Sequence, residues 1–159
     1  EPEPEPEEEV ITPAHPQEEV PIEHKNLVQR IAAMSVSEKI KFGITGDKEA
    51  RNALIKESNK LITGAVLKNP RITDNEIIQL TATKGTSEDI LRTISRSRDW
   101  LKNYTIKYNL ITNPKTPVAA SMNLLRQLHK KDLINISKSK AIPSILAITA
   151  KKVLATFRG

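Results

Sequence analysis

Signals that stop one helix and start the next recur along this chain from Lys25 onward, and they constrain its fold more than any other feature. Between these signals the aliphatic residues follow helical spacing, and no window alternates convincingly as a β-strand would. Thr73 and Glu76, for example, form a capping-box pair just before Ile77 and Ile78. A series of short amphipathic helices of this kind predicts an all-α fold.

The expected helix starts are set by side-chain caps or by a proline in the first turn. Helices are expected to begin at Ser35 (paired with Glu38), Asp47, Thr73, Ser87, Asp99, Pro117, Asp132 and Pro143. The helix that follows Ser35 is expected to end near Gly43. The helix that Asp99 opens is expected to be the longest and to run to Ile111.

Three connectors between the expected helices share one pattern. A small polar residue is followed by a short basic step, then Ile or Thr, then a cap or a first-turn proline. The copies occupy residues 69–73, 113–117 and 139–143, with a looser copy at 83–87. The three clear copies lie 44 and 26 residues apart, near the lengths of helical repeats. Because one helix pair cannot bury its own apolar face, the pattern predicts stacked helix pairs, a short α-solenoid.

The connector segments also carry a family resemblance. Val66–Thr73 and Leu110–Pro117 resemble the helix-Asn-Pro-x-Thr-Pro-helix unit of the leucine-rich repeat variant, a group of HEAT-like α-solenoids. The resemblance covers roughly residues 45–156. This part of the chain is also similar to solenoid modules of bacterial proteins. It implies a right-handed HEAT-like solenoid. A founding member of the group is associated with an iron–sulfur segment, a property that does not carry over because this chain has no cysteine.

Charge divides the chain into two parts. Residues 1–24 contain nine glutamates and no Lys or Arg, and they begin with Glu-Pro repeats that predict a disordered acidic tail or linker. Residues 25–159 hold all 25 Lys and Arg against ten Asp and Glu, a net charge of +15, and are expected to form a basic helical-repeat domain. The tail is interpreted as a spacer to an upstream domain, or as an acidic arm that competes for the basic body.

Several chemistries lack the residues that they need. Without cysteine there is no disulfide, no thiolate nucleophile and no cysteine-ligated metal. The histidines at 15, 24 and 129 do not form a helical metal-binding pattern, and no nucleophile or phosphate-loop motif occurs. We therefore predict no catalytic residue, no cofactor and no metal site. No apolar stretch reaches the length of about 18 residues that a membrane span needs, and no signal peptide is visible, so a cytoplasmic location is expected.

The densest candidate surface combines cations with aromatic residues between positions 92 and 108. The candidate partner-binding residues there and in the following basic run are Arg92, Arg96, Arg98, Trp100, Lys102, Asn103, Lys107, Lys130 and Lys131. A tryptophan flanked by cations is typical of hot spots in protein interfaces, and it also suits nucleic-acid binding by stacking. The alternative is that Trp100 packs between neighbouring repeats.

These features favour a non-enzymatic interaction or scaffold module that binds a protein partner, in particular an acidic surface or peptide. Nucleic-acid binding is the second hypothesis, with the acidic tail as an intramolecular competitor. A third hypothesis is a DNA glycosylase of HEAT-like type, which rests on Asp99 beside Trp100 and on analogy of fold alone. Docking to an anionic membrane surface through lysines is the fourth.

Overall fold

The computed structural model describes residues 22–157, with side chains from Asn26 onward, and this part of the chain is helical without a strand. The all-α prediction is confirmed. Residues 1–21, most of the predicted acidic tail, lie outside the described residues. The chain forms two units, residues 1–33 and 34–159. In the first unit the structure describes one helix, α1 (Ile22–Ala32). None of the described helices is long and apolar enough to cross a membrane.

The second unit contains nine α-helices and one short 3-10 helix within residues 34–157. They are α2 (Val36–Thr45), α3 (Lys48–Leu54), α4 (Lys60–Leu67), α5 (Asp74–Ala82), α6 (Glu88–Ser95), η1 (Trp100–Lys102), α7 (Tyr104–Thr112), α8 (Val118–Leu125), α9 (Lys130–Lys138) and α10 (Ser144–Ala155).

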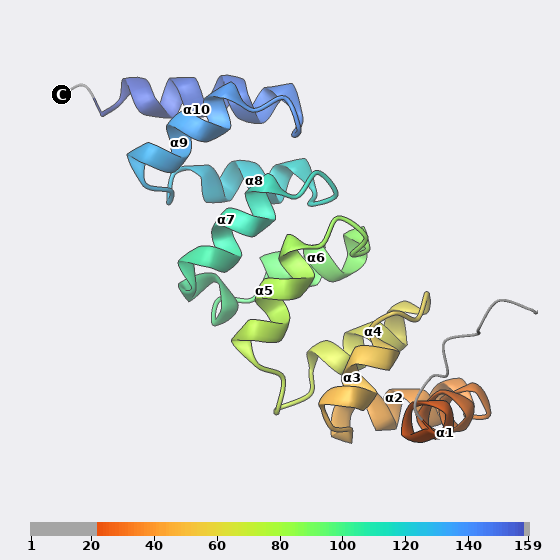
Figure 1. Cartoon of the computed structure of the whole chain (residues 1–159). Coiled ribbons are helices and arrows are strands. Elements are labelled where there is room, and N and C mark those ends of the chain that lie inside the picture. Colours follow the sequence, from red (N-terminus) through yellow and green to blue (C-terminus); the bar gives the residue numbers. More distant parts are fainter. Residues whose placement is uncertain (1–21, 158–159) are drawn as a thin grey trace, which may run out of the picture. The chain divides into compact units, whose positions relative to one another are not determined.

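Within this unit the α-helices alternate between two columns (Figure 1). The even column holds α2, α4, α6, α8 and α10, in which α2 packs on α4, α4 on α6, and α8 on α10. The odd column holds α3, α5, α7 and α9, in which α5 packs on α7. Each odd helix also packs on the even helix that follows it. The predicted stack of helix pairs is therefore present.

The core between the columns is built from aliphatic side chains. The largest fully buried ones in its central layers are Leu91, Ile94, Ile106, Leu110, Ile111, Leu125 and Leu133. Trp100, Tyr104 and Tyr108 pack against this cluster only as half-buried side chains. Burial of each aliphatic side chain contributes about 1.5–3 kcal/mol, so the core holds the stack together without a large aromatic contribution.

Most of the predicted caps are confirmed. Thr73 and Glu76 form the complete capping box of α5, and Asp47 and Ser87 accept hydrogen bonds from the backbone N–H groups of Ala50 and Ile90. Ser35 caps α2 through the N–H of Glu38. These contacts are local in sequence, which is why the pattern predicts them well.

Two predicted boundaries are wrong. Asp99 does not open one long helix, because its side chain makes no cap hydrogen bond; η1 intervenes and α7 begins after Asn103. Asp132 does not open α9, which already begins at Lys130. The helix α2 ends at Thr45, near the predicted end at Gly43, so Gly43 is not its terminator. Gly43 instead lets α4 approach, because a Cβ atom there would lie 3.2 Å from the backbone nitrogen of Val66.

Two asparagines of the Asn-Pro connectors bind one layer of the stack to the previous one. The side-chain amide of Asn69, after α4, donates to the carbonyls of Gly43 and Gly46 at the end of α2, both at 2.9 Å. Asn113, after α7, donates in the same way to the carbonyls of Thr81 and Thr83 at the end of α5, at 2.9 and 3.1 Å. Both side chains are buried. Each thus provides donors for helix-end carbonyls that have no partner within their own helix.

The shared connector pattern does not mark one position of a repeat. The connector at 69–73 follows an even helix, whereas those at 83–87, 113–117 and 139–143 follow the odd helices α5, α7 and α9. This explains why the copies have irregular spacings. The two Asn-Pro connectors follow helices of different columns, but both contact the preceding layer of the stack.

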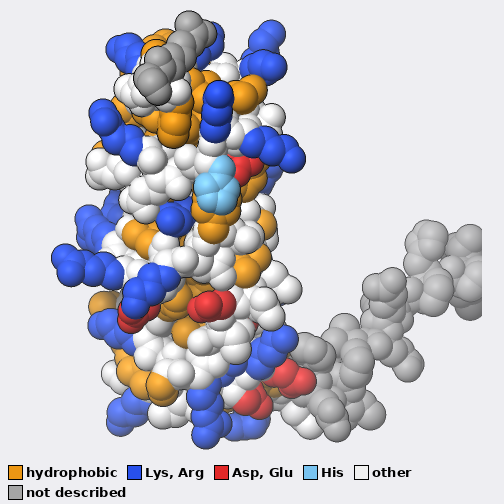
Figure 2. All heavy atoms as spheres, turned by 90° about the vertical axis from the view of Figure 1, so that its left-hand side faces the viewer, with side chains coloured by type: hydrophobic (Ala, Val, Ile, Leu, Met, Phe, Trp, Pro, Cys, Tyr) orange, Lys and Arg blue, Asp and Glu red, His pale blue; other side chains and the backbone are white. Residues whose placement is uncertain are grey.

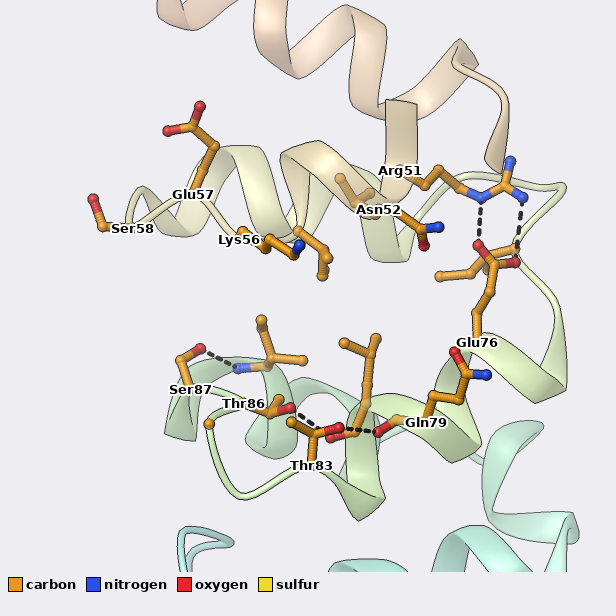
Figure 3. A pocket seen from close by; sticks show the side chains of 16 residues that line it. Arg51, Asn52, Lys56, Glu57, Ser58, Glu76, Gln79, Thr83, Thr86 and Ser87 are labelled. Carbon is orange, nitrogen blue, oxygen red and sulfur yellow. Dashed lines mark hydrogen bonds and ion pairs between the residues drawn. The ribbon is translucent and has the colours of Figure 1, made fainter. Parts of the chain in front are cut away.

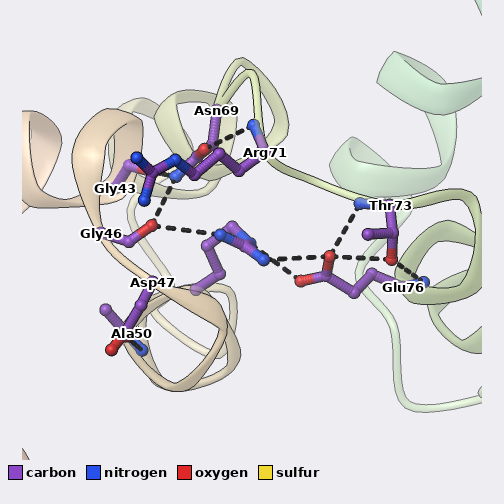
Figure 4. A network of polar contacts seen from close by, with 9 residues as sticks. Gly43, Gly46, Asp47, Ala50, Asn69, Arg71, Thr73 and Glu76 are labelled. Carbon is purple, nitrogen blue, oxygen red and sulfur yellow. Dashed lines mark hydrogen bonds and ion pairs between the residues drawn. The ribbon is translucent and has the colours of Figure 1, made fainter.

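A buried ion pair fastens α3 to α5 (Figure 4). Arg51 Nε lies 2.9 Å from Glu76 Oε1, and Arg51 Nη2 lies 3.2 Å from Glu76 Oε2. Arg51 also donates to the carbonyl of Gly46 at 3.1 Å, and Glu76 accepts from the N–H of Thr73 at 2.7 Å. The network thereby ties the ion pair to the end of α2 and to the start of α5.

We predict that Glu76→Gln lowers the free energy of unfolding by about 3 kcal/mol, because it leaves the charge of Arg51 buried without its counter-ion. Burial alone would raise the pKa of Glu76, but hydrogen bonds from Arg51 and Thr73 favour the carboxylate and hold the pKa below its ordinary value of 4.5. A lowered pKa gives stability that is complete above pH 4.5 and is lost as the pH falls through the folded-state value.

Urea unfolding from pH 7 to pH 3 measures both effects. The wild type should lose stability below pH 4.5 more steeply than Glu76→Gln. Glu57→Gln is the control, because Glu57 pairs with Lys39 near the surface and should cost less than about 1 kcal/mol. Equal losses in the two variants would contradict the role assigned to the buried pair.

We also predict that Asn113→Ala lowers stability by about 1–3 kcal/mol, since the carbonyls of Thr81 and Thr83 lose buried donors. The control is Asn123→Ala on the exposed surface of α8, where thermal unfolding should change little. If both variants unfold at the wild-type temperature, the asparagine does not hold the layers together.

Candidate interaction surface

Positive charge is concentrated in the second half of the helical stack. Residues 90–157 contain thirteen Lys and Arg and two Asp, a net charge of +11. Residues 34–89 contain nine Lys and Arg and eight Asp and Glu, a net charge of +1. Figure 2 shows Lys and Arg side chains along the whole length of one face, whereas the Asp and Glu side chains lie mainly in its lower half.

Tyr104 joins two basic segments that are separate in the sequence. Its ring stacks on the imidazole of His129, with the centroids 4.2 Å apart and the planes 13° apart. Its hydroxyl donates to Asp132 and accepts from the backbone N–H of His129 at 3.0 Å. One segment, 96–107, leads into α7, and the other, 126–131, leads into α9. The tyrosine therefore holds both at one edge of the stack.

Lys107 makes a second link between these segments. Its Nζ lies 5.8 Å from the centroid of the Tyr104 ring and 3.4 Å from Oε1 of Gln127. We call the two joined segments, 96–107 and 126–131, the basic edge. Their cations are Arg96, Arg98, Lys102, Lys107, Arg126, Lys130 and Lys131.

Local structure explains why Tyr104 can make these contacts. Oδ1 of Asn103 accepts hydrogen bonds from the N–H groups of Thr105 and Ile106, which makes Tyr104 the first residue of α7. His129 occupies the N-cap position of α9. The two helix starts thus face each other. Burial and the hydrogen bond to Asp132 raise the pKa of the Tyr104 hydroxyl above 10.0, so this group acts as a donor to the carboxylate.

The sequence-predicted candidates have different environments. Arg96, Arg98, Lys130 and Lys131 are exposed and make no ion pair within the described residues. Lys102 is exposed and lies 3.5 Å from Asp99.

Other candidates are engaged in structural contacts. Arg92 is bound by Glu88 and by Asp89, the latter at 2.9 Å, and lies on α6 rather than on the basic edge. Trp100 packs half-buried against the core. Asn103 is engaged as the cap of α7. The partner-binding role of all these residues stays a prediction.

A groove lies between α3 and α5, and the sequence did not indicate it (Figure 3). Its volume is about 660 Å³. Its apolar lining consists of Ile55, Val66, Ile72, Leu80 and Ile90. Ile55 directly follows α3, Ile72 lies in the connector between α4 and α5, and the others come from α4, α5 and α6. Single residues at these positions look like ordinary core positions, so no local pattern could have revealed the groove.

The groove and the basic edge do not bring together ligands for a metal. Among residues 26–157 no group of three His, Asp or Glu side chains could hold an ion.

We predict that Tyr104→Phe lowers the free energy of unfolding by about 1 kcal/mol, because it removes the hydroxyl that bridges α7 and α9 but keeps the stacked ring. Tyr108→Phe is the matched control, because the Tyr108 hydroxyl makes no hydrogen bond within the described part of the chain. Urea unfolding of both variants measures the difference. A larger loss for Tyr108→Phe would contradict the bridging role of Tyr104.

Comparison with protein-family models, with curated proteins and with solved structures finds no match to this chain.

Proposed function

We propose that this chain is a non-enzymatic interaction module whose basic edge binds an acidic segment of a protein partner. The observation that carries the proposal is the junction at Tyr104, which places the basic segments 96–107 and 126–131 side by side. Most cations there lack a counter-ion within the described residues, and of the two nearby aspartates Asp132 is already engaged by Tyr104. An anionic partner would supply the missing charge.

The side chains of the basic edge favour an acidic peptide over nucleic acid. Proteins that bind single strands use aromatic rings on which bases stack. Here the ring of Tyr104 is covered by His129, and Trp100 packs against the core. Four of the seven cations of the edge are lysines, and a lysine offers a point charge without the planar fork that reads base edges.

The proposal extends to the type of repeat. The two columns of short helices and the Asn-Pro connectors support assignment to the HEAT-like α-solenoids, with the leucine-rich repeat variant as the specific type. Solenoids of stacked helix pairs commonly use an extended surface to hold a partner, and the basic edge is such a surface because it crosses two consecutive layers.

The test is binding of a fluorescein-labelled peptide of about fifteen glutamates, followed by anisotropy at low and at physiological salt. We predict that the double variant Lys130→Glu with Lys131→Glu weakens binding by at least about tenfold, which equals about 1.4 kcal/mol. Wild-type binding should also weaken as salt rises, because the attraction is screened.

The double variant Lys41→Glu with Lys48→Glu is the matched control, because it changes the net charge equally but lies in α2 and α3, away from the basic edge. Its affinity should stay within about twofold of the wild type after the long-range charge effect is allowed for. Separate titrations use a single-stranded oligonucleotide, a DNA duplex and vesicles with anionic lipid. Equal loss in the two double variants, or tight binding of an oligonucleotide or vesicle without binding of the peptide, would refute the proposal.

A further inference from the structure

We infer that the groove between α3 and α5 is a second docking site, and that its occupant is a short aliphatic segment of a protein partner carrying one carboxylate. The groove lies in the first half of the stack, where net charge is near zero. The groove shares no lining residue with the basic edge. Four features of the groove carry the inference: its closed end, its apolar floor, its free amides and a lysine that has no ion pair in the described part of the chain.

The closed end is set by the Arg51–Glu76 ion pair. In Figure 3 this pair joins α3 to α5 at one end of the groove, whereas Ser58 and Ser87 stand at the other. Between these ends α3 and α5 are not in the close contact that α5 makes with α7. The ion pair therefore holds α3 and α5 at a fixed separation.

The floor is an incompletely covered part of the core. Ile55, Ile72 and Leu80 are half-buried and line the groove, with Val66 and Ile90 buried beside them. One layer further along the stack, Ile106 and Leu110 of α7 are fully buried. Aliphatic side chains of a ligand could complete the same kind of burial between α3 and α5. The groove volume of about 660 Å³ falls in the range of ordinary ligand pockets, about 300–1,000 Å³.

The rim indicates a peptide rather than a simple hydrocarbon. The side-chain amides of Asn52 and Gln79 stand on opposite walls (Figure 3) and make no hydrogen bond within the described residues. An amide side chain offers both a donor and an acceptor, which matches the N–H and C=O groups of a peptide backbone. A fatty-acid chain would leave both of these amides without partners.

The charges of the lining indicate a carboxylate. Two acidic side chains line the groove, and both are neutralised, Glu76 by Arg51 and Glu57 by Lys39 at 2.8 Å. Lys56 is the lining cation without an ion pair among the described residues, and in Figure 3 its amine lies at the upper wall of the groove. A ligand carboxylate next to the aliphatic side chains would pair with it.

The experiment selects ligands from a displayed library of random peptides against the whole chain. We expect the enriched peptides to share two or more aliphatic residues next to an Asp or Glu. Synthetic peptides from the selection are then titrated against variants that fill the groove. Gly85→Phe adds a ring to the wall, where a Cβ would meet only Thr83 Cγ2 at 3.9 Å. Gln79→Trp is a second filling variant at an exposed position of α5.

Matched controls separate the groove from the rest of the surface. Gly64→Phe makes the same change on α4, at a glycine where nothing lies within 4 Å of the position that a Cβ would take. Gly64 does not line the groove. Lys48→Gln is the control for Lys56→Gln, which removes the unpaired cation. Circular dichroism and thermal unfolding check that each variant is folded before its affinity is compared.

We expect each filling variant to weaken peptide binding at least about tenfold and Lys56→Gln to weaken it about fivefold, while both controls stay within about twofold of wild type. The inference is overturned if no peptide is enriched, if the enriched peptides lack aliphatic residues, or if they bind folded Gly85→Phe and Gln79→Trp as tightly as wild type. Equal binding by Lys56→Gln and wild type overturns the assigned carboxylate. Reversing charge at Lys130 and Lys131 should leave this binding unchanged, so failure here and failure of the basic-edge proposal are distinguishable.

Discussion

Each α-helix ends in carbonyl groups that have no hydrogen-bond partner within the helix, and a stack of short helices buries several of them. In this chain the missing donors come from a neighbouring helix or connector. The carbonyl of Gly46, after α2, accepts from Asn69 in the connector after α4 and from Arg51 in α3. The carbonyls of Thr81 and Thr83 receive Asn113. Each donor thereby fixes how far one layer can shift on the previous one, because buried carbonyls without donors are costly.

Polar links join neighbouring helices of the odd column in two ways, and the kind of link determines whether a groove remains between the helices. Between α5 and α7, Asn109 adds bonds to the carbonyl of Ile78 and to Oγ1 of Thr81, so the two helices are joined along their length. Between α3 and α5 the ion pair Arg51–Glu76 makes the polar link at one end. A long charged pair spans more distance than an asparagine and its carbonyl. The groove lies beside this wider junction and not beside the closer one.

How well the sequence predicts a contact depends on how far apart the two residues lie in the chain. The caps by Asp47, Thr73 and Ser87 were predicted because each contact spans three residues. The break between η1 and α7 was not, because Asp99 and Asn103 both suit an N-cap and the sequence alone does not decide between them. The contacts Arg51–Glu76 and Tyr104–His129 each span 25 residues. A single sequence carries no signal for such pairs, although it did indicate the cations that Tyr104 gathers.

The distribution of charge gives a physical reason for treating the two halves as surfaces of different kinds. Uncompensated like charges repel one another and destabilise a compact state, so a net charge of +11 within residues 90–157 opposes folding of that half. Solubility alone would be served as well by cations spread evenly over all layers. In residues 34–89, by contrast, nine Lys and Arg stand against eight Asp and Glu, and an apolar groove stays uncovered. Binding of an anionic partner would relieve the repulsion in one half, and an aliphatic ligand would complete the core in the other.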